Sequence, residues 1–214
     1  MTATATGRLR TGTRARHDAL ETTAFATALL AGSLPLDRYV AQLAAYRVVL
    51  RTLETELSHT TEPAVAGLWT AEDLRKVPLI ERDLRHFAAR GASPVRWPAA
   101  AAVAFAGEIR TTAVAEPLSL LGFLYVLEGS TLGARYLSRY VTGAYGLHGT
   151  DGIAYYASGD RARWTRFTTR LEEALTGPAA QTRALAAADR AYHHTTRITE
   201  ALSADLPPPQ RCAS

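Results

Sequence analysis

Cysteine, methionine and lysine are each nearly absent from this chain of 214 residues, which has one of each. The single cysteine, Cys212, excludes an internal disulfide and any zinc or iron–sulfur centre built on several cysteines. Lys76 is the only lysine among 24 basic residues, and the formal net charge is +4 without a long run of one sign. A nucleic-acid-binding protein gathers its basic residues on one stripe. We therefore expect no nucleic acid partner and a mild preference for anionic ligands or acidic proteins.

Long apolar runs are missing as well. The most apolar stretch, residues 118–127, has about half the ~20 residues that a membrane span requires, so it predicts a buried core helix. Residues 1–16 contain threonine, alanine and arginine but lack the apolar centre of a signal peptide. These absences predict a cytoplasmic protein without a membrane partner.

Alternating β-branched residues, the pattern of strands, are scarce, whereas apolar residues recur at helical spacing along most of the chain. The sequence therefore predicts an all-α fold in a single domain of about seven helices over residues 8–204. A flexible N-terminus (1–7) and a flexible proline-rich tail (205–214) are expected to flank it. The principal helical segments are predicted at 8–30, 36–59, 68–90 with an interruption near Pro78, 99–110, 118–145, 161–175 and 181–202.

Several common catalytic signatures do not occur. The chain has no helical zinc motif of the H-E-x-x-H kind, no G-x-S-x-G elbow, no phosphate-binding loop and no G-x-G-x-x-G turn. The sequence therefore does not indicate metal-dependent hydrolysis, serine hydrolysis or dinucleotide binding.

The first segment that could carry chemistry lies near the N-terminus. Arg10, Arg14, His17 and Glu21 are separated by four, three and four residues, so a helix places them on one face. A neutral imidazole there can bind a metal through one nitrogen, while the carboxylate one turn later orients the ring. The two guanidinium groups suit carboxylates of a ligand. The alternative is an exposed helix face stabilised by ion pairs.

The second segment is centred on Gly129 and Gly133, which lie one helical turn apart. Two glycines on one face permit very close approach of a flat or bulky group, and they predict a kink. Ser130 and Thr131 can bond back to helix carbonyls and add to the bend. Close packing of another helix on these small residues is the alternative.

Taken together, the two segments resemble the heme oxygenase family. The run Tyr-Val-Leu-Glu-Gly-Ser-Thr-Leu-Gly at 125–133 resembles the distal-helix signature of its bacterial, biliverdin-producing branch, often found beside bacterial phytochromes. The resemblance implies a heme oxygenase-like helical bundle. Heme would lie between an N-terminal proximal helix and a kinked, glycine-rich distal helix.

The resemblance also implies roles for single residues. His17 corresponds to the proximal iron ligand, with Glu21 close by, and Arg10 and Arg14 correspond to basic positions near the heme propionates. Candidate catalytic residues on the distal helix are Gly129, Gly133 and Ser130, and further heme-binding candidates are Tyr125 and Tyr192. Ser130 stands where animal members carry an acid that organises water, which leaves open the group that orders water here. A further propionate partner is expected among Arg163, Arg166 and Arg170.

The implied activity is oxidative cleavage of heme to biliverdin, with release of CO and ferrous iron. Heme is then both substrate and cofactor, O2 is the oxidant, and electrons come from a ferredoxin or a flavoprotein reductase. A bacterial phytochrome is a candidate acceptor of the bilin. The alternative is a heme or bilin carrier on the same fold that performs no turnover. An enzyme of the thiaminase type is disfavoured because its cysteine lies inside a helix, whereas Cys212 follows a proline run.

Overall fold

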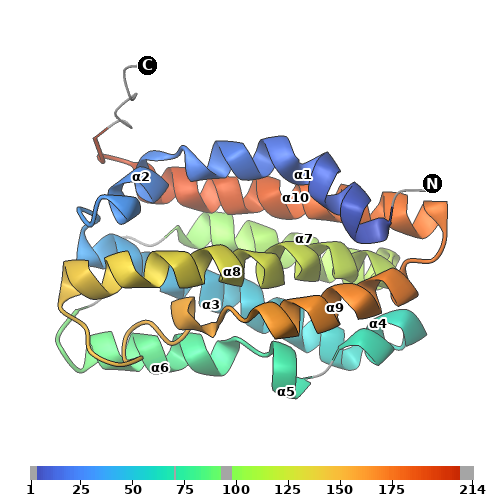
Figure 1. Ribbon diagram of the computed structural model, residues 1–214, viewed down its shortest axis with the longest axis horizontal. Coiled ribbons are helices and arrows are strands. Elements are labelled where there is room, and N and C mark those ends of the chain that lie inside the picture. The colour runs from blue at the N-terminus through green and yellow to red at the C-terminus, as the bar shows by residue number, and fades with distance from the viewer. Residues whose placement is uncertain (1–3, 70, 93–97, 208–214) are drawn as a thin grey trace.

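The computed structural model describes residues 4–69, 71–92 and 98–207, and this part of the chain is helical without a strand (Figure 1). The all-α prediction is therefore confirmed. The elements are α1 (Ala5–Glu21), α2 (Ala24–Leu30), α3 (Leu36–His59), α4 (Pro63–Leu68), α5 (Ala71–Leu74), α6 (Val77–Ala88), α7 (Ala99–Ala115), η1 (Pro117–Ser119), α8 (Leu120–Tyr145), η2 (Tyr156–Ser158), α9 (Arg161–Ala174) and α10 (Pro178–Ser203). The predicted tail lies outside the described residues from position 208 onward.

The long helices form a bundle in which α1 and α10 lie side by side, and α8 runs below them in roughly the same direction in the view of Figure 1. Helix α3 packs against both α6 and α7, and α10 also packs against α7 and α8. In this arrangement α1 and α8 lie on opposite sides of a cavity that both helices line.

Helix α3 has the bounds that its apolar periodicity predicts. Leu43, Val49, Leu53 and Leu57 recur on its inner face, and each is at most 1% exposed. Full burial of such a side chain contributes about 1.5–3 kcal/mol, so this face fixes the centre of the bundle.

The first helix begins at Ala5, three residues before the predicted domain boundary at Arg8. The amide nitrogens of Ala5 and Thr6 donate to the Glu172 carboxylate of α9, at 2.7 and 2.9 Å, and the Thr4 hydroxyl accepts from the nitrogen of Gly7. Free amides at a helix start need such acceptors. The carboxylate comes from more than 160 residues away, so the local sequence predicted a flexible segment where residues 5–7 are helical.

The segment predicted as one helix over 8–30 is divided at Thr22 and Thr23. Thr23 adopts an extended backbone, and its hydroxyl accepts from the nitrogen of Ala26. Thr23 is therefore the N-cap of α2, which begins at Ala24. The prediction of one helix was wrong because the N-cap signal of Thr23 was overlooked.

Helix α8 begins as a core helix. The segment Pro117–Tyr145 is long and apolar enough to cross a membrane by composition, but 67% of its most apolar window is buried inside the fold. A Cβ on Gly122 would lie 2.2 Å from the carbonyl oxygen of Ala184, so α8 and α10 cross in close contact there. Helix α8 therefore contacts α10 at Gly122, about two helical turns before Gly129.

Candidate functional site

A cavity of about 510 Å³ lies between α1 and α8. Its volume is in the range of pockets that hold small molecules and cofactors. The lining combines an apolar floor from several helices with a polar rim on α1. The lining residues used below are Arg10, Thr13, Arg14, His17, Asp18, Glu21, Gln42, Tyr46, Tyr125, Gly129, Ser130, Gly133, Tyr155, Tyr156, Trp164 and Tyr192.

Helix α1 turns one face toward this cavity and another toward α10. Arg10, Arg14, His17 and Glu21, which the sequence placed on one face, all line the cavity. Arg16 instead pairs with Asp189 of α10 at 2.8 Å, on the opposite side of the helix. The four residues therefore share the cavity, and the same exposed face also carries the ion pairs of the alternative, because Arg14 lies 3.7 Å from Asp18 and His17 lies 3.7 Å from Glu21.

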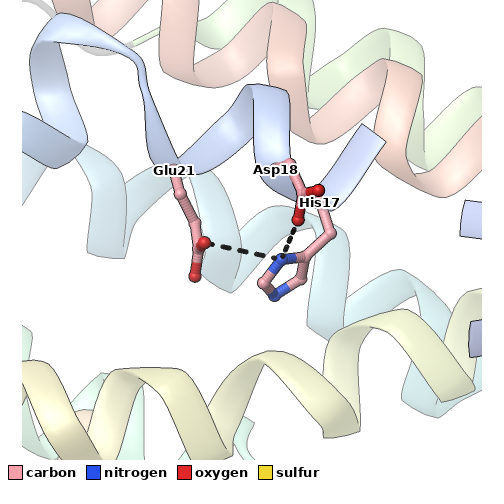
Figure 2. Close-up of side chains that lie close together, drawn as sticks. All are labelled: His17, Asp18 and Glu21. Carbon is pink, nitrogen blue, oxygen red and sulfur yellow. Dashed lines mark ion pairs between the residues drawn. The ribbon is translucent and has the colours of Figure 1, made fainter. Parts of the chain in front are cut away.

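The imidazole of His17 extends from α1 into the gap above α8 (Figure 2). Its Nδ1 atom lies 3.7 Å from both Asp18 Oδ1 and Glu21 Oε2, which is beyond ordinary hydrogen-bond length. The ring meets Tyr192 edge-on, with centroids 6.2 Å apart. Both carboxylates thus lie on the Nδ1 side of the ring, so Nε2 is the nitrogen suited to a ligand in the cavity.

Helix α8 contributes the opposite wall through Gly129, Ser130 and Gly133. A Cβ on Gly133 would meet no atom within 4 Å, so the backbone there borders open space. A Cβ on Gly129 would lie 3.2 Å from Cη2 of Trp164, so the indole packs against the backbone of Gly129. The helical conformation continues through both glycines, and the hydroxyls of Ser130 and Thr131 donate to the carbonyls of Leu127 and Glu128 as predicted.

A buried hydroxyl cluster forms the inner wall, and the sequence reasoning missed it. Tyr46, Tyr155 and Tyr156 are each at most 8% exposed and line the cavity together with Gln42. The Tyr156 hydroxyl donates to Gln42 Oε1 at 2.5 Å. Adjacent tyrosines in a glycine-rich segment were the available signal, but that segment was interpreted only as a loop.

Asp83 of α6 fixes the turn that carries two of these tyrosines. Its carboxylate accepts from the amide nitrogens of Ala154 and Tyr155 at 2.7 and 2.8 Å, and the residue is fully buried. Two charge-assisted bonds hold the turn in one conformation. The tyrosine hydroxyls are therefore positioned before any ligand arrives.

Burial raises the pKa of seven of the nine tyrosines, to about 12 for both Tyr46 and Tyr192. The folded state prefers neutral phenols, so their contribution to stability is complete below the unfolded pKa near 10 and declines as the pH rises above it. We expect an ultraviolet phenolate titration at pH 10 to find about half of the tyrosines ionised in denaturant and at most about a quarter in the folded protein. Equal titration of the two states would contradict the buried cluster.

The helix expected to supply a further propionate partner does not bring Arg163 to the cavity. Arg163 Nε donates to Glu128 Oε1 at 2.7 Å, and its side chain is 15% exposed. Arg166 lies 3.6 Å from Asp73, also away from the cavity lining. Arg163 was therefore a wrong candidate, because a buried carboxylate already holds it.

The comparisons with known proteins agree with this geometry. Residues 3–201 match the family model described as heme oxygenase. The chain belongs to the heme oxygenase family. A protein of Xanthomonas campestris pv. campestris named heme oxygenase is 30% identical over 181 residues, covering 81% of this chain and 97% of that protein.

Solved heme oxygenases share the fold. Heme oxygenase-2 of Synechocystis, solved in complex with heme and NO, superposes with a TM-score of 0.80 at 20% identity over 94% of this chain and 85% of its own. Heme oxygenase-1 of Synechocystis, solved in complex with heme, gives 0.79 at 22% identity, covering 96% and 94%. The heme oxygenase of Leptospira interrogans gives 0.78 at 22% identity, covering 94% and 99%. The predicted family and the all-α heme oxygenase fold are confirmed.

Proposed function

We propose that this chain cleaves heme oxidatively to biliverdin, with release of CO and ferrous iron, using O2 and electrons supplied from outside. The observation that supports the proposal is the cavity itself, which has an imidazole on one wall and an open glycine backbone on the other. Heme, the substrate, supplies the iron at which O2 is activated and the macrocycle that is cut. A flat ring fits between a helix with a projecting ligand and a helix without a side chain at Gly133.

His17 is proposed as the iron ligand through Nε2. The carboxylates of Asp18 and Glu21, both 3.7 Å from Nδ1, favour a tautomer with the proton on Nδ1. Such an orienting carboxylate is usual beside a metal-binding histidine, and it raises the basicity of the imidazole, which makes Nε2 a stronger ligand for a metal. The side chain is 52% exposed, so a ligand in the cavity can reach the ring.

Arg10 and Arg14 are proposed to bind the propionate groups. Both line the cavity, and the side chain of Arg14 is 81% exposed. Guanidinium groups suit carboxylates because they donate two parallel hydrogen bonds. Their position fixes the carboxylate-bearing edge of the ring on the α1 side of the cavity mouth.

The hydroxyl cluster is proposed to take the place of the missing distal acid. The Ser130 side chain lowers the pKa of the Tyr155 phenol, but burial, the larger effect, raises this pKa above its ordinary value. Tyr155 therefore keeps its proton at Oη over the physiological range, as Tyr46 does. Neutral O–H donors around Ser130 can order water and pass a proton without placing a strong acid beside the reacting oxygen. Gly129 and Gly133 let the helix backbone approach the ring, and Tyr125 and Tyr192 pack at its sides.

The electron donor and the bilin acceptor are proposed on chemistry alone. The chain carries no flavin or nicotinamide signature, so a ferredoxin or a flavoprotein reductase must deliver electrons. The exposed arginines at the cavity mouth favour an acidic donor. A bacterial phytochrome as acceptor and a cytoplasmic location complete the proposal.

A hemin titration followed by reduction tests the function. We expect one hemin per chain, an intense Soret band and, after addition of ascorbate in air, replacement of that band by a green bilin with release of CO. A heme spectrum that persists under reductant and O2 without a green product would identify a carrier instead. Failure to bind hemin at all would overturn both proposals.

A further inference from the structure

A buried carboxylate on α6 holds the backbone of a residue that lines the cavity. Asp83 is 0% exposed, and each of its two oxygens accepts from one amide. Oδ1 accepts from the nitrogen of Ala154 at 2.7 Å, and Oδ2 accepts from the nitrogen of Tyr155 at 2.8 Å. The backbone hydrogen bonds within this turn begin at other amides, among them those of Ile153 and Ala157. The amides of Ala154 and Tyr155 therefore depend on Asp83 for an acceptor.

Tyr155 connects this hydrogen bond directly to the site, because its own phenol lies in the inner wall of the cavity. Burial raises the pKa of the phenol, and the Ser130 side chain is close enough to lower it in part. The ring of Tyr155 meets those of Tyr46 and Tyr156 edge-on, with centroids 6.1 and 5.9 Å apart. A shift of the Tyr155 backbone thus moves a group of the site itself, without an intervening side chain.

The charged and titratable groups around Asp83 leave its carboxyl group without a cation of its own. Arg82, the preceding residue of α6, pairs with Asp151 at the surface. Tyr39 of α3 faces Asp83 as a phenol whose pKa is raised, chiefly by burial, and His86 follows three residues later on α6. Burial therefore raises the pKa of Asp83 to about 6, although the two amides oppose the shift.

A neutral carboxyl group cannot hold both amides as the ionised group does. Protonation leaves one strong acceptor, the carbonyl oxygen, and removes the charge that makes such hydrogen bonds roughly twice as strong as neutral ones. The fold itself is not at risk. Because the pKa of Asp83 is higher in the folded than in the unfolded chain, this group favours the folded state as the pH falls from about 6 toward the unfolded value near 3.9. The effect of the proton is therefore local to the turn.

We propose that Asp83 is a positioning residue that holds Tyr155 at the cavity wall only while its carboxyl group is ionised, so that cleavage of the ring slows when this group takes up a proton. The proposal rests on the proposed function for its effect on catalysis. Its structural part, the control of the turn by the ionisation of Asp83, concerns the protein without heme.

The first test follows the amide signals of Ala154 and Tyr155 in the heme-free protein by proton–nitrogen NMR as the pH is varied. We expect both signals to shift together with a midpoint near pH 6. D83N mimics the neutral carboxyl group, so neither signal should show this midpoint in that variant. H86Q should keep the shared midpoint, which separates Asp83 from the imidazole that titrates in a similar range.

Two outcomes of this titration would overturn the proposal. One is a midpoint that persists in D83N and disappears in H86Q, because the imidazole would then be the titrating group. The other is a parent in which the two signals do not shift between about pH 5 and 7. The second outcome is measured without any substitution, so it decides the question even if D83N fails to fold.

The second test is the initial rate of bilin formation as a function of pH. The ionised fraction of Asp83 falls from nearly complete at about pH 7.5 to about a tenth at pH 5, so the parent rate should fall at least about threefold over this range. D83N should be slow at both pH values and should not show this fall. A D83N profile that matches the parent profile would overturn the positioning role.

Glu54 provides the matched control for this test. It is a largely buried carboxylate whose Oε1 accepts from the amides of Lys76 and Val77 at 2.6 and 3.0 Å, and it does not line the cavity. E54Q should keep the parent profile, and a profile changed as in D83N would overturn the specific role of Asp83. A parent that forms no bilin would refute the proposed function, whereas the NMR titration would still decide whether Asp83 controls the turn.

Discussion

His17→Ala is expected to abolish bilin formation while leaving the fold intact. The imidazole is half exposed and contributes little to the core, so the melting temperature should change by less than about 2 °C, as for most surface substitutions. Without the iron ligand, hemin affinity should fall roughly tenfold to a hundredfold, which corresponds to about 1.4–2.8 kcal/mol. The Soret band should move, and the green product should drop below detection in the ascorbate assay.

His193→Ala is the matched control for this variant. His193 is an exposed histidine on α10 that does not line the cavity, so its removal should leave the hemin spectrum and turnover unchanged. Added imidazole should restore part of the spectrum of His17→Ala by entering the vacated space. Identical heme spectra for the His17 variant and the parent would remove His17 from the site.

Gly133→Leu is expected to separate stability from ligand binding. A Cβ at this position meets no atom within 4 Å, and Gly133 lines the cavity, so the leucine side chain has open space to extend into it. A helical glycine is roughly 0.8–1 kcal/mol less favourable than alanine, and leucine is almost as good a helix former as alanine, so the helix should gain somewhat less than about 1 kcal/mol. The same side chain occupies the space proposed for the ring, so hemin affinity should fall at least about tenfold, or 1.4 kcal/mol. Thermal unfolding and hemin titration measure the two effects.

Gly143→Leu provides the control on the same helix. Gly143 is exposed, a Cβ there also meets nothing within 4 Å, and the residue does not line the cavity. This variant should gain the same stability and bind hemin as the parent does. If both variants bind hemin equally well, the ring does not lie against Gly133.

The parts of the site that follow local periodicity could be predicted from the sequence. Residues on one helix face keep their relationship in any fold that forms the helix, so Arg10, Arg14 and His17 were grouped correctly. The apolar stripe of α3 fixed its bounds in the same way. Gly129 and Gly133 were predicted to face either a ligand or a helix, and the structure places them at the cavity while Gly122 contacts the helix.

The parts that depend on distant residues could not be predicted. The start of α1 depends on Glu172, and the position of Tyr155 depends on Asp83, a residue 72 positions away. Arg163 was a reasonable candidate for a ligand contact because nothing local indicates that Glu128 holds it. Such tertiary hydrogen bonds and ion pairs carry no periodic signal, so they appear only once the helices are packed.

The crystal structure of the hemin complex tests the central claim most directly. The account predicts the iron next to Nε2 of His17, with the backbone of Gly129 and Gly133 across the opposite face of the ring and the propionates near Arg10 and Arg14. A ring bound elsewhere, or a His17 side chain turned toward Asp18 with another residue on the iron, would contradict it.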